Sequence, residues 1–177
     1  MLAERLRADG HAVCELREPG GTRAGEELRR IVLDADLPLD ARAEALVFAA
    51  SRAQGMAEIV EPALARGEII VADRFVDSSL VYQGAVRGLG VEAVRSINAF
   101  ALRGLAPDLV ILLDVRLEDA RARRQGGEGD RFEDESDEFA RRVLTAYREV
   151  CSEAVVIDAH GAPELVAEQV WKAVHAR

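Results

Sequence analysis

Hydrophobic residues along this chain fall into two kinds of run. Some runs are short and nearly continuous, such as EIIVA at 68–72 and DLVILLDV at 108–115. Others are longer and place apolar residues three or four positions apart, as in the stretch 22–34. Short continuous runs are typical of buried strands, whereas a spacing of three or four is typical of helices with one apolar face.

The two patterns alternate from one end of the chain to the other. Strands are predicted at residues 11–16, 68–72, 108–115 and 154–159. Helices are predicted at residues 1–9, 22–34, 40–66 (interrupted or kinked at Pro62), 91–103, 136–150 and 162–176. Because helices separate strands that are apolar on both faces, we expect an α/β fold in which helices cover both faces of a parallel sheet. No linker or repeat divides the sequence, so residues 1–177 are expected to form a single domain.

Composition narrows the function classes. The chain is 49% hydrophobic and 31% charged, which is a globular profile. Its net charge of −9 gives it no general affinity for nucleic acid or for anionic membranes, so a bound phosphate would need local clusters of arginine. No apolar run is long enough to span a membrane. Cys14 and Cys151 are interpreted as buried free thiols, which indicates a reducing, cytoplasmic location.

Charged pairs follow the first two predicted strands. Arg17 and Glu18 end the first, and Asp73 and Arg74 end the second. Ligands bind at the carboxyl ends of parallel strands, an arginine fork fits phosphate oxygens, and an aspartate can hold a water of Mg²⁺. The PGG turn at 19–21 allows the backbone to approach a ligand closely. These pairs could also be solvated ion pairs, but two of them on one sheet edge favour a binding site.

Two further groups of side chains could recognise the ring of a nucleotide base. Phe48 and Arg52 lie four residues apart, on a flank beside the apolar stripe of the helix 40–66. An aromatic ring beside a guanidinium could stack a base, although Phe48 at the edge of the core and a solvated Arg52 fit the pattern equally well. That stripe is predicted to contain Leu46, Ala49, Ala53, Met56 and Val60. The segment DSSLVYQG at 77–84 offers hydroxyl and amide groups, namely those of Ser78, Ser79, Tyr82 and Gln83.

An arginine- and glycine-rich segment lies between the third strand and the helix 136–150. Mobile arginines can neutralise the charge that develops on a transferring phosphoryl group. A solvated surface loop would have the same composition. The arginines concerned are Arg121, Arg123, Arg124 and Arg131.

Taken together, these stretches resemble the thymidylate kinase family over essentially the whole chain. The motifs occur in the family's order: REPGG at 17–21, FAASRAQ at 48–54, DRF at 73–75 with SS and YQG downstream, and DRFE at 130–133. The resemblance implies a P-loop nucleoside-monophosphate-kinase fold with a lid at about 116–135. It also implies phosphoryl transfer from ATP, with Mg²⁺, to dTMP, and a homodimer packed through helices.

The resemblance also implies roles for single residues. Phe48 would stack on thymine, and Arg52 and Gln83 would read the edges of the ring. Ser79 would lie beside the base and Tyr82 beside the sugar. The acceptor phosphate would be held by Arg74 and Arg17, next to Glu18, with Asp73 near Mg²⁺. The lid would contribute Arg124 and Arg131 to catalysis and Arg121 and Arg123 to ATP binding, with the choice among 121, 123 and 124 left open.

The sequence departs from the family at its start. The phosphate loop G-x-x-x-x-G-K-[ST] does not occur, and the only lysine is Lys172. We therefore expect Met1 to be an internal methionine of a product longer by about twenty residues. A missing first strand would leave two inner strand edges unpaired, and ATP would lose its main anchor. The alternatives are a non-catalytic protein that binds dTMP and a kinase acting on another nucleoside or nucleotide.

Overall fold

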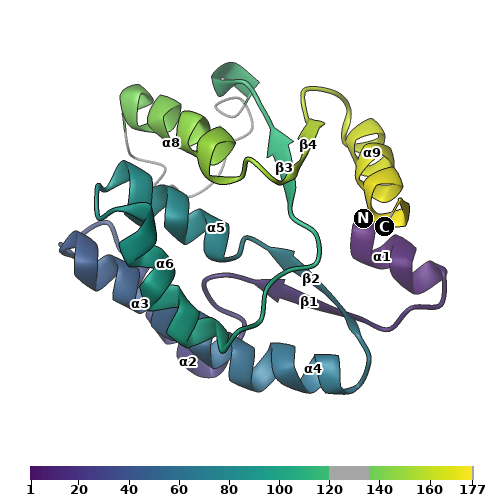
Figure 1. Cartoon of the computed structure of the whole chain (residues 1–177), viewed down its shortest axis with the longest axis horizontal. Coiled ribbons are helices and arrows are strands. Elements are labelled where there is room, and N and C mark those ends of the chain that lie inside the picture. The colour runs from purple at the N-terminus through teal and green to yellow at the C-terminus, as the bar shows by residue number, and fades with distance from the viewer. Residues whose placement is uncertain (120–135, 177) are drawn as a thin grey trace.

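The computed structural model of this chain describes residues 1–119 and 136–176. Strands and helices occur where the sequence predicts them, with ends shifted by a few residues (Figure 1). The strands are β1 (Val13–Arg17), β2 (Ile69–Asp73), β3 (Ile111–Asp114) and β4 (Val155–Asp158). The helices are α1 (Leu2–Ala8), α2 (Arg23–Leu33), α3 (Ala41–Gly55), α4 (Glu61–Ala65), α5 (Val76–Ser79), α6 (Val91–Leu102), α8 (Asp137–Val150) and α9 (Pro163–His175), with π-helical segments η1 (Met56–Val60) and η2 (Leu80–Val86).

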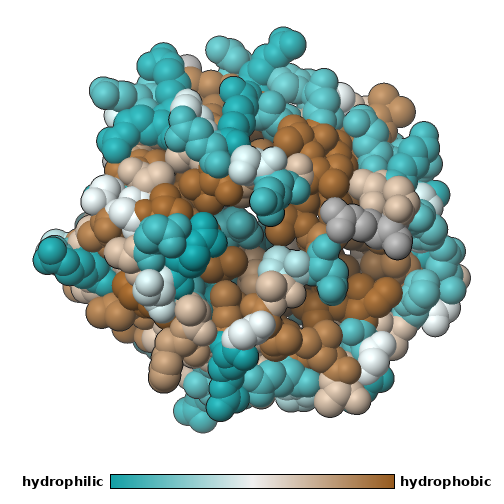
Figure 2. All heavy atoms as spheres, in the orientation of Figure 1, coloured by the Kyte–Doolittle hydropathy of each residue, from teal (hydrophilic) through white to brown (hydrophobic). Residues whose placement is uncertain are grey.

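The strands are parallel, as predicted for an α/β fold, but they do not form one sheet. β1 pairs with β2, and β3 pairs with β4. In the described part of the chain no strand joins β2 to β3, so each inner strand has an unpaired edge, as expected from the sequence. Burial on both faces is also incomplete, because Leu113 is 48% exposed and Val156 is 58% exposed. Figure 2 shows hydrophobic side chains at the surface over the region where Figure 1 places β3 and β4.

The long predicted helix at 40–66 is divided as the proline suggested. α3 passes into the π-helical segment η1, and α4 then begins with Pro62 in its first turn. Proline has no N–H to donate, and its ring would clash with the carbonyl four residues earlier in a continuous α-helix. A wider π turn before the proline avoids that clash. The predicted apolar stripe is wrong at one position, since Leu46 is 56% exposed and Ala45 is buried in its place.

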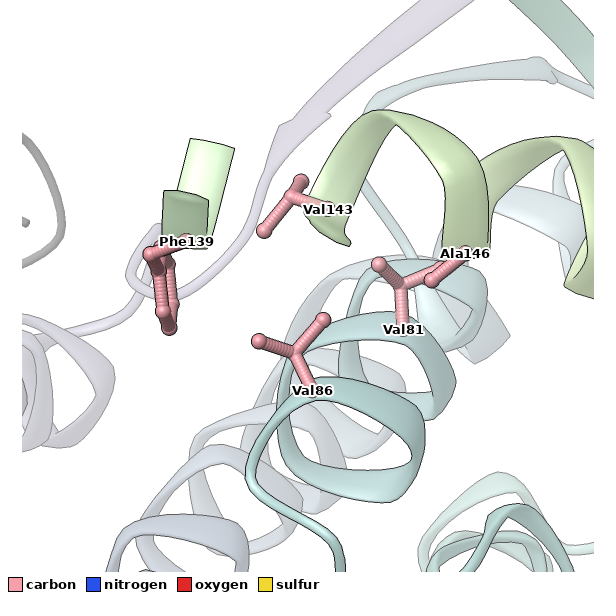
Figure 3. Packing of buried hydrophobic residues seen from close by; sticks show 5 residues of the cluster. All are labelled: Val81, Val86, Phe139, Val143 and Ala146. Atoms are coloured by element: carbon pink, nitrogen blue, oxygen red, sulfur yellow. The ribbon is translucent and has the colours of Figure 1, made fainter. Parts of the chain in front are cut away.

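The helical stretch 76–86, formed by α5 and η2, was not predicted as a helix, because its polar start and Gly84 hide the apolar spacing. It packs against α6 and α8. Figure 3 shows valines of η2 pointing toward apolar side chains of α8. The cluster contains Val81, Val86, Phe139, Val143 and Ala146. This packing fixes the segment that carries Tyr82 and Gln83.

The two ends of the described chain lie side by side, where α1 packs against α9 (Figure 1). Arg5 forms an ion pair of 2.6 Å with Glu168, and its guanidinium lies 4.1 Å from the centre of the Trp171 ring.

Among the helices that the structure describes, none combines the length and the apolar character needed to cross a membrane.

Candidate functional site

The carboxyl ends of β1 and β2 bring two charged pairs together. Arg17 is the register partner of Asp73, and the backbone N–H of Glu18 donates to the Asp73 carbonyl at 3.2 Å. Parallel pairing therefore places an exposed carboxylate and an exposed guanidinium on adjacent strands, with Arg74 one residue further. This is the arrangement that the sequence pattern predicts for a phosphate site at the sheet edge.

The turn that follows β1 is held in place by hydrogen bonds from its own backbone. The N–H of Gly21 donates to Glu26 Oε1 at 2.8 Å, and the N–H of Gly20 donates to Ser51 Oγ at 3.1 Å. Gly20 has a φ of 128°, and a Cβ there would lie 2.5 Å from Glu26 Oε1. The Gly21 hydrogen bond lowers the pKa of Glu26. The glycines are therefore required by the backbone geometry of the turn.

Glu18 turns inward, where it forms a buried ion pair with Arg52. Arg52 Nε lies 2.8 Å and Nη2 lies 2.6 Å from Glu18 Oε2, and the two side chains are only 5% and 2% exposed. Burial raises the pKa of Glu18, and the guanidinium offsets this only in part. The interpretation of Arg52 as a solvated arginine is therefore wrong: α3 carries it into the interior because a carboxylate meets it there.

Two more polar side chains complete the cluster around Arg52. Arg52 Nη1 donates to Ser79 Oγ at 3.2 Å and also donates to Asn98 Oδ1. Its guanidinium lies 5.7 Å from the centre of the Phe75 ring. Phe48, the ring expected to accompany Arg52, is partly buried one helical turn earlier on α3. Asn98 was not found from the sequence, because it lies in no motif.

A second buried contact orients Gln83. Its Nε2 donates to Glu44 Oε1 at 2.9 Å, and Arg87 Nε lies 3.6 Å from the same oxygen. Glu44 is fully buried and Gln83 is 1% exposed. Since the NH₂ group of Gln83 faces Glu44, its carbonyl oxygen faces away from that carboxylate. Nothing in the sequence pattern singles out Glu44.

Arg74 adopts a backbone conformation that is unusual for a residue with a side chain. Its φ is 63°, in the left-handed region, which costs on the order of 1–3 kcal/mol. Its Nη1 donates to the Tyr147 hydroxyl at 3.4 Å, and its guanidinium lies 5.8 Å from the centre of the Tyr82 ring. The Tyr147 hydroxyl is also 2.9 Å from Ser78 Oγ. Strain of this kind clusters at functional sites, where neighbouring groups hold it in place.

Tyr147 supplies a pH-dependent prediction. Burial raises its pKa from 10.0 to about 12. The unfolded chain loses this proton first, so the free energy of unfolding should fall by about 2–3 kcal/mol as the pH rises through this interval. In Tyr147→Phe this part of the decline should disappear, which urea unfolding at pH values around 9 and 12 would measure.

Cys151, whose pKa burial raises to about 11, would contribute a separate decline that remains in the variant. A wild-type stability that does not change above about pH 10 would contradict the prediction for Tyr147.

Asp73 is the residue predicted to lie near Mg²⁺. Within residues 1–119 and 136–176 no group of three or more His, Cys, Asp or Glu side chains could enclose a metal ion. Mg²⁺ in phosphoryl-transfer sites is held by one or two carboxylates, by waters and by the phosphates themselves. A single exposed aspartate at the strand end fits that mode. The predicted lid residues Arg121, Arg123, Arg124 and Arg131 lie outside the described residues.

A family model and curated relatives that match this chain have the same description, and the matches extend over most of its length. A family model described as thymidylate kinase matches residues 1–170. A thymidylate kinase of Caldanaerobacter subterraneus subsp. tengcongensis is 46% identical over 147 residues, which cover 83% of this chain and 71% of the relative. Thymidylate kinases of Halothermothrix orenii and Synechococcus sp. (strain JA-3-3Ab) are 40% and 43% identical, cover 98% and 100% of this chain, and are each matched over 87% of their own length.

Proposed function

Because this chain belongs to the thymidylate kinase family, we propose that it phosphorylates dTMP to dTDP with ATP as the donor. The observation that carries the proposal is the meeting of Arg17, Asp73 and Arg74 at the ends of two paired strands. Two arginines and one aspartate at the ends of paired strands are suited to a phosphate site, because a guanidinium fork fits the phosphate oxygens.

The acceptor nucleotide would be bound by residues of three segments. Arg74 and Arg17 hold the phosphate, and Tyr82 lies beside the sugar. Phe48 stacks on the thymine. The edges of the base are contacted by Arg52 and Gln83, and Ser79 lies beside it. The buried contacts described above hold these three side chains in place. The polar groups are thereby positioned before the ligand arrives.

The chemical step needs positioning and charge neutralisation, with no covalent intermediate. Asp73 would hold Mg²⁺ together with the phosphates, and the ion would supply charge stabilisation between donor and acceptor oxygens. Arg124 and Arg131 are proposed to neutralise the transferring phosphoryl group, and Arg121 and Arg123 to contact ATP. These four assignments rest on the motif order alone.

A second candidate function is dTMP binding without turnover. It needs only the proposed acceptor site at the ends of β1 and β2 and the buried contacts around Arg52, which the structure describes. A kinase acting on another monophosphate remains the third alternative.

Calorimetric titration of the protein purified from its source cells with dTMP, dUMP, dCMP and dGMP, followed by an assay for dTDP formed from dTMP and ATP, tests these candidates. We expect dTMP to bind most tightly, to stabilise the protein by about 2.7 kcal/mol at one hundred times its dissociation constant, and to be converted to dTDP. Tight dTMP binding without dTDP would overturn the kinase proposal in favour of the second candidate. A preference for dGMP or dCMP would overturn both in favour of the third.

The proposed homodimer can be tested at Phe100, which is 89% exposed on α6. α6 packs against α3, whose Leu46 is also exposed, and exposed apolar side chains on neighbouring helices are typical of interfaces. Phe100→Asp should weaken self-association by about 30-fold or more, because it replaces an apolar side chain of the proposed interface with a charge. Analytical ultracentrifugation would measure this. As a control, Leu165→Asp on α9 should leave the mass unchanged; a wild-type protein that is monomeric throughout would refute the dimer.

A further inference from the structure

Asn98 is a buried amide whose orientation is fixed from both ends. It lies on α6 and is 1% exposed. Its Nδ2 donates to the Val94 carbonyl at 2.8 Å, and its Oδ1 accepts from Arg52 Nη1. Rotating the amide by half a turn would point its NH₂ group at the guanidinium and its oxygen at a carbonyl. Neither contact could then form a hydrogen bond, so the side chain can only present an acceptor to Arg52.

Among the described residues, the guanidinium of Arg52 has three polar side chains as partners, which are those of Asn98, Glu18 and Ser79. Glu18 binds Nε and Nη2, and Nη1 donates to both Ser79 and Asn98. A guanidinium has five N–H donors, so these contacts leave one N–H, on Nη2, for any further acceptor. The direction of that last donor is set by the plane of the guanidinium, and Asn98 fixes this plane from the side opposite Glu18.

We propose that Asn98 is a positioning residue for base selection, which acts by fixing the plane of the Arg52 guanidinium so that its remaining N–H meets a carbonyl oxygen on a pyrimidine. This inference rests on the proposed function, in which Arg52 lies beside the base. Thymine and uracil carry a carbonyl at the ring position where cytosine carries an amino group. A fixed N–H donor forms a hydrogen bond with the carbonyl of thymine. In cytosine the same donor would face an amino group, which is also a donor, so cytosine would bind less tightly.

The contact also has a structural role, and the two roles differ in what they change. If a buried side chain only supports packing, replacing it would lower the stability of the protein and weaken the binding of all pyrimidine nucleotides to the same extent. A positioning residue would in addition change the ratio of the dTMP and dCMP affinities, because a guanidinium that can tilt discriminates less between a carbonyl and an amino group. The affinity ratio is therefore the decisive readout.

The experiment compares three variants with the wild-type chain by calorimetric titration of dTMP and dCMP, at a temperature where each protein is folded. Asn98→Leu removes the acceptor, and its dTMP-to-dCMP affinity ratio should fall about tenfold or more. Asn98→Asp loses the donor to Val94 but keeps an oxygen facing Arg52, and its ratio should stay within about threefold of wild type because the charge-assisted contact still fixes the guanidinium. Ser96→Ala is the matched control, since Ser96 Oγ also donates to a carbonyl one turn earlier on α6 without contacting Arg52.

Each outcome separates the inference from the function on which it rests. If wild type prefers dTMP and Asn98→Leu keeps that preference at reduced stability, Asn98 is only structural and the inference is overturned. If Asn98→Leu unfolds, Asn98→Asp decides, because loss of its preference despite a retained acceptor would also overturn the inference. A wild-type chain that does not bind dTMP would overturn the proposed function and the inference together.

Discussion

Arg52→Met is expected to destabilise the protein by about 3–5 kcal/mol. The substitution keeps most of the side-chain volume and removes the charge, so Glu18 is left in the interior without its partner. The cost should depend on pH. Burial already raises the pKa of Glu18, and without Arg52 the folded state would hold this proton still more strongly. The folded state then binds more protons than the unfolded state, so stability should fall as the pH rises above the ordinary pKa of glutamate.

Urea unfolding of Arg52→Met at about pH 5 and pH 8 would measure both effects. The double variant Arg52→Met with Glu18→Gln should recover part of the loss, because it removes the unpaired charge. Arg95→Met is a suitable control, since Arg95 pairs with Glu92 on the surface and should cost at most about 1 kcal/mol. A loss in Arg52→Met as small as that of the control would show that the buried pair contributes little.

Arg74→Gly is expected to separate ligand binding from stability. Loss of the guanidinium should weaken dTMP binding by about 2–4 kcal/mol, or roughly 30- to 1000-fold, because it removes charge-assisted hydrogen bonds to the phosphate. Glycine relieves the backbone strain of about 1–3 kcal/mol but loses the contacts of Arg74 with Tyr147 and Tyr82, so the free energy of unfolding should change by no more than about 1 kcal/mol.

Thymidine provides the matched ligand for this experiment, since it has the same base and sugar but no phosphate. Its affinity should be nearly the same for wild type and Arg74→Gly in calorimetric titrations. Arg74→Lys should give an intermediate dTMP affinity, because lysine keeps the charge and loses the planar fork. Equal losses for dTMP and thymidine would mean that Arg74 acts on the shape of the site and not on the phosphate.

The edge where Arg17 meets Asp73 could be predicted because it depends on local information. Apolar runs mark where strands end, parallel strands end at one edge, and both residues come directly after such runs. The turn at 19–21 could be recognised for the same reason, from its glycines. Family resemblance then supplied the kind of ligand, which residue patterns alone left open.

The buried contacts could not be predicted, because each one joins residues that are far apart in the sequence. Helical spacing puts Arg52 on the flank of α3, and only the carboxylate of Glu18 explains its burial. Asn98 and Tyr147 come from helices that contain no motif, and their roles depend on packing of those helices against the site. Sequence patterns describe one element at a time, whereas these contacts depend on how elements meet.

The two separate sheets have a consequence for the behaviour of the chain in solution. In the described residues β2 and β3 each pair on one side only, so their other backbone N–H and C=O groups are free to bond with a strand from another molecule. The run around β3, VILLDV, has no proline, and the only charge within it is one aspartate, so nothing in it prevents such pairing. Two-stranded sheets are also marginal by themselves. We therefore expect concentrated samples to aggregate through edge-to-edge templating, faster as the concentration rises, and a strand that filled the gap would suppress this.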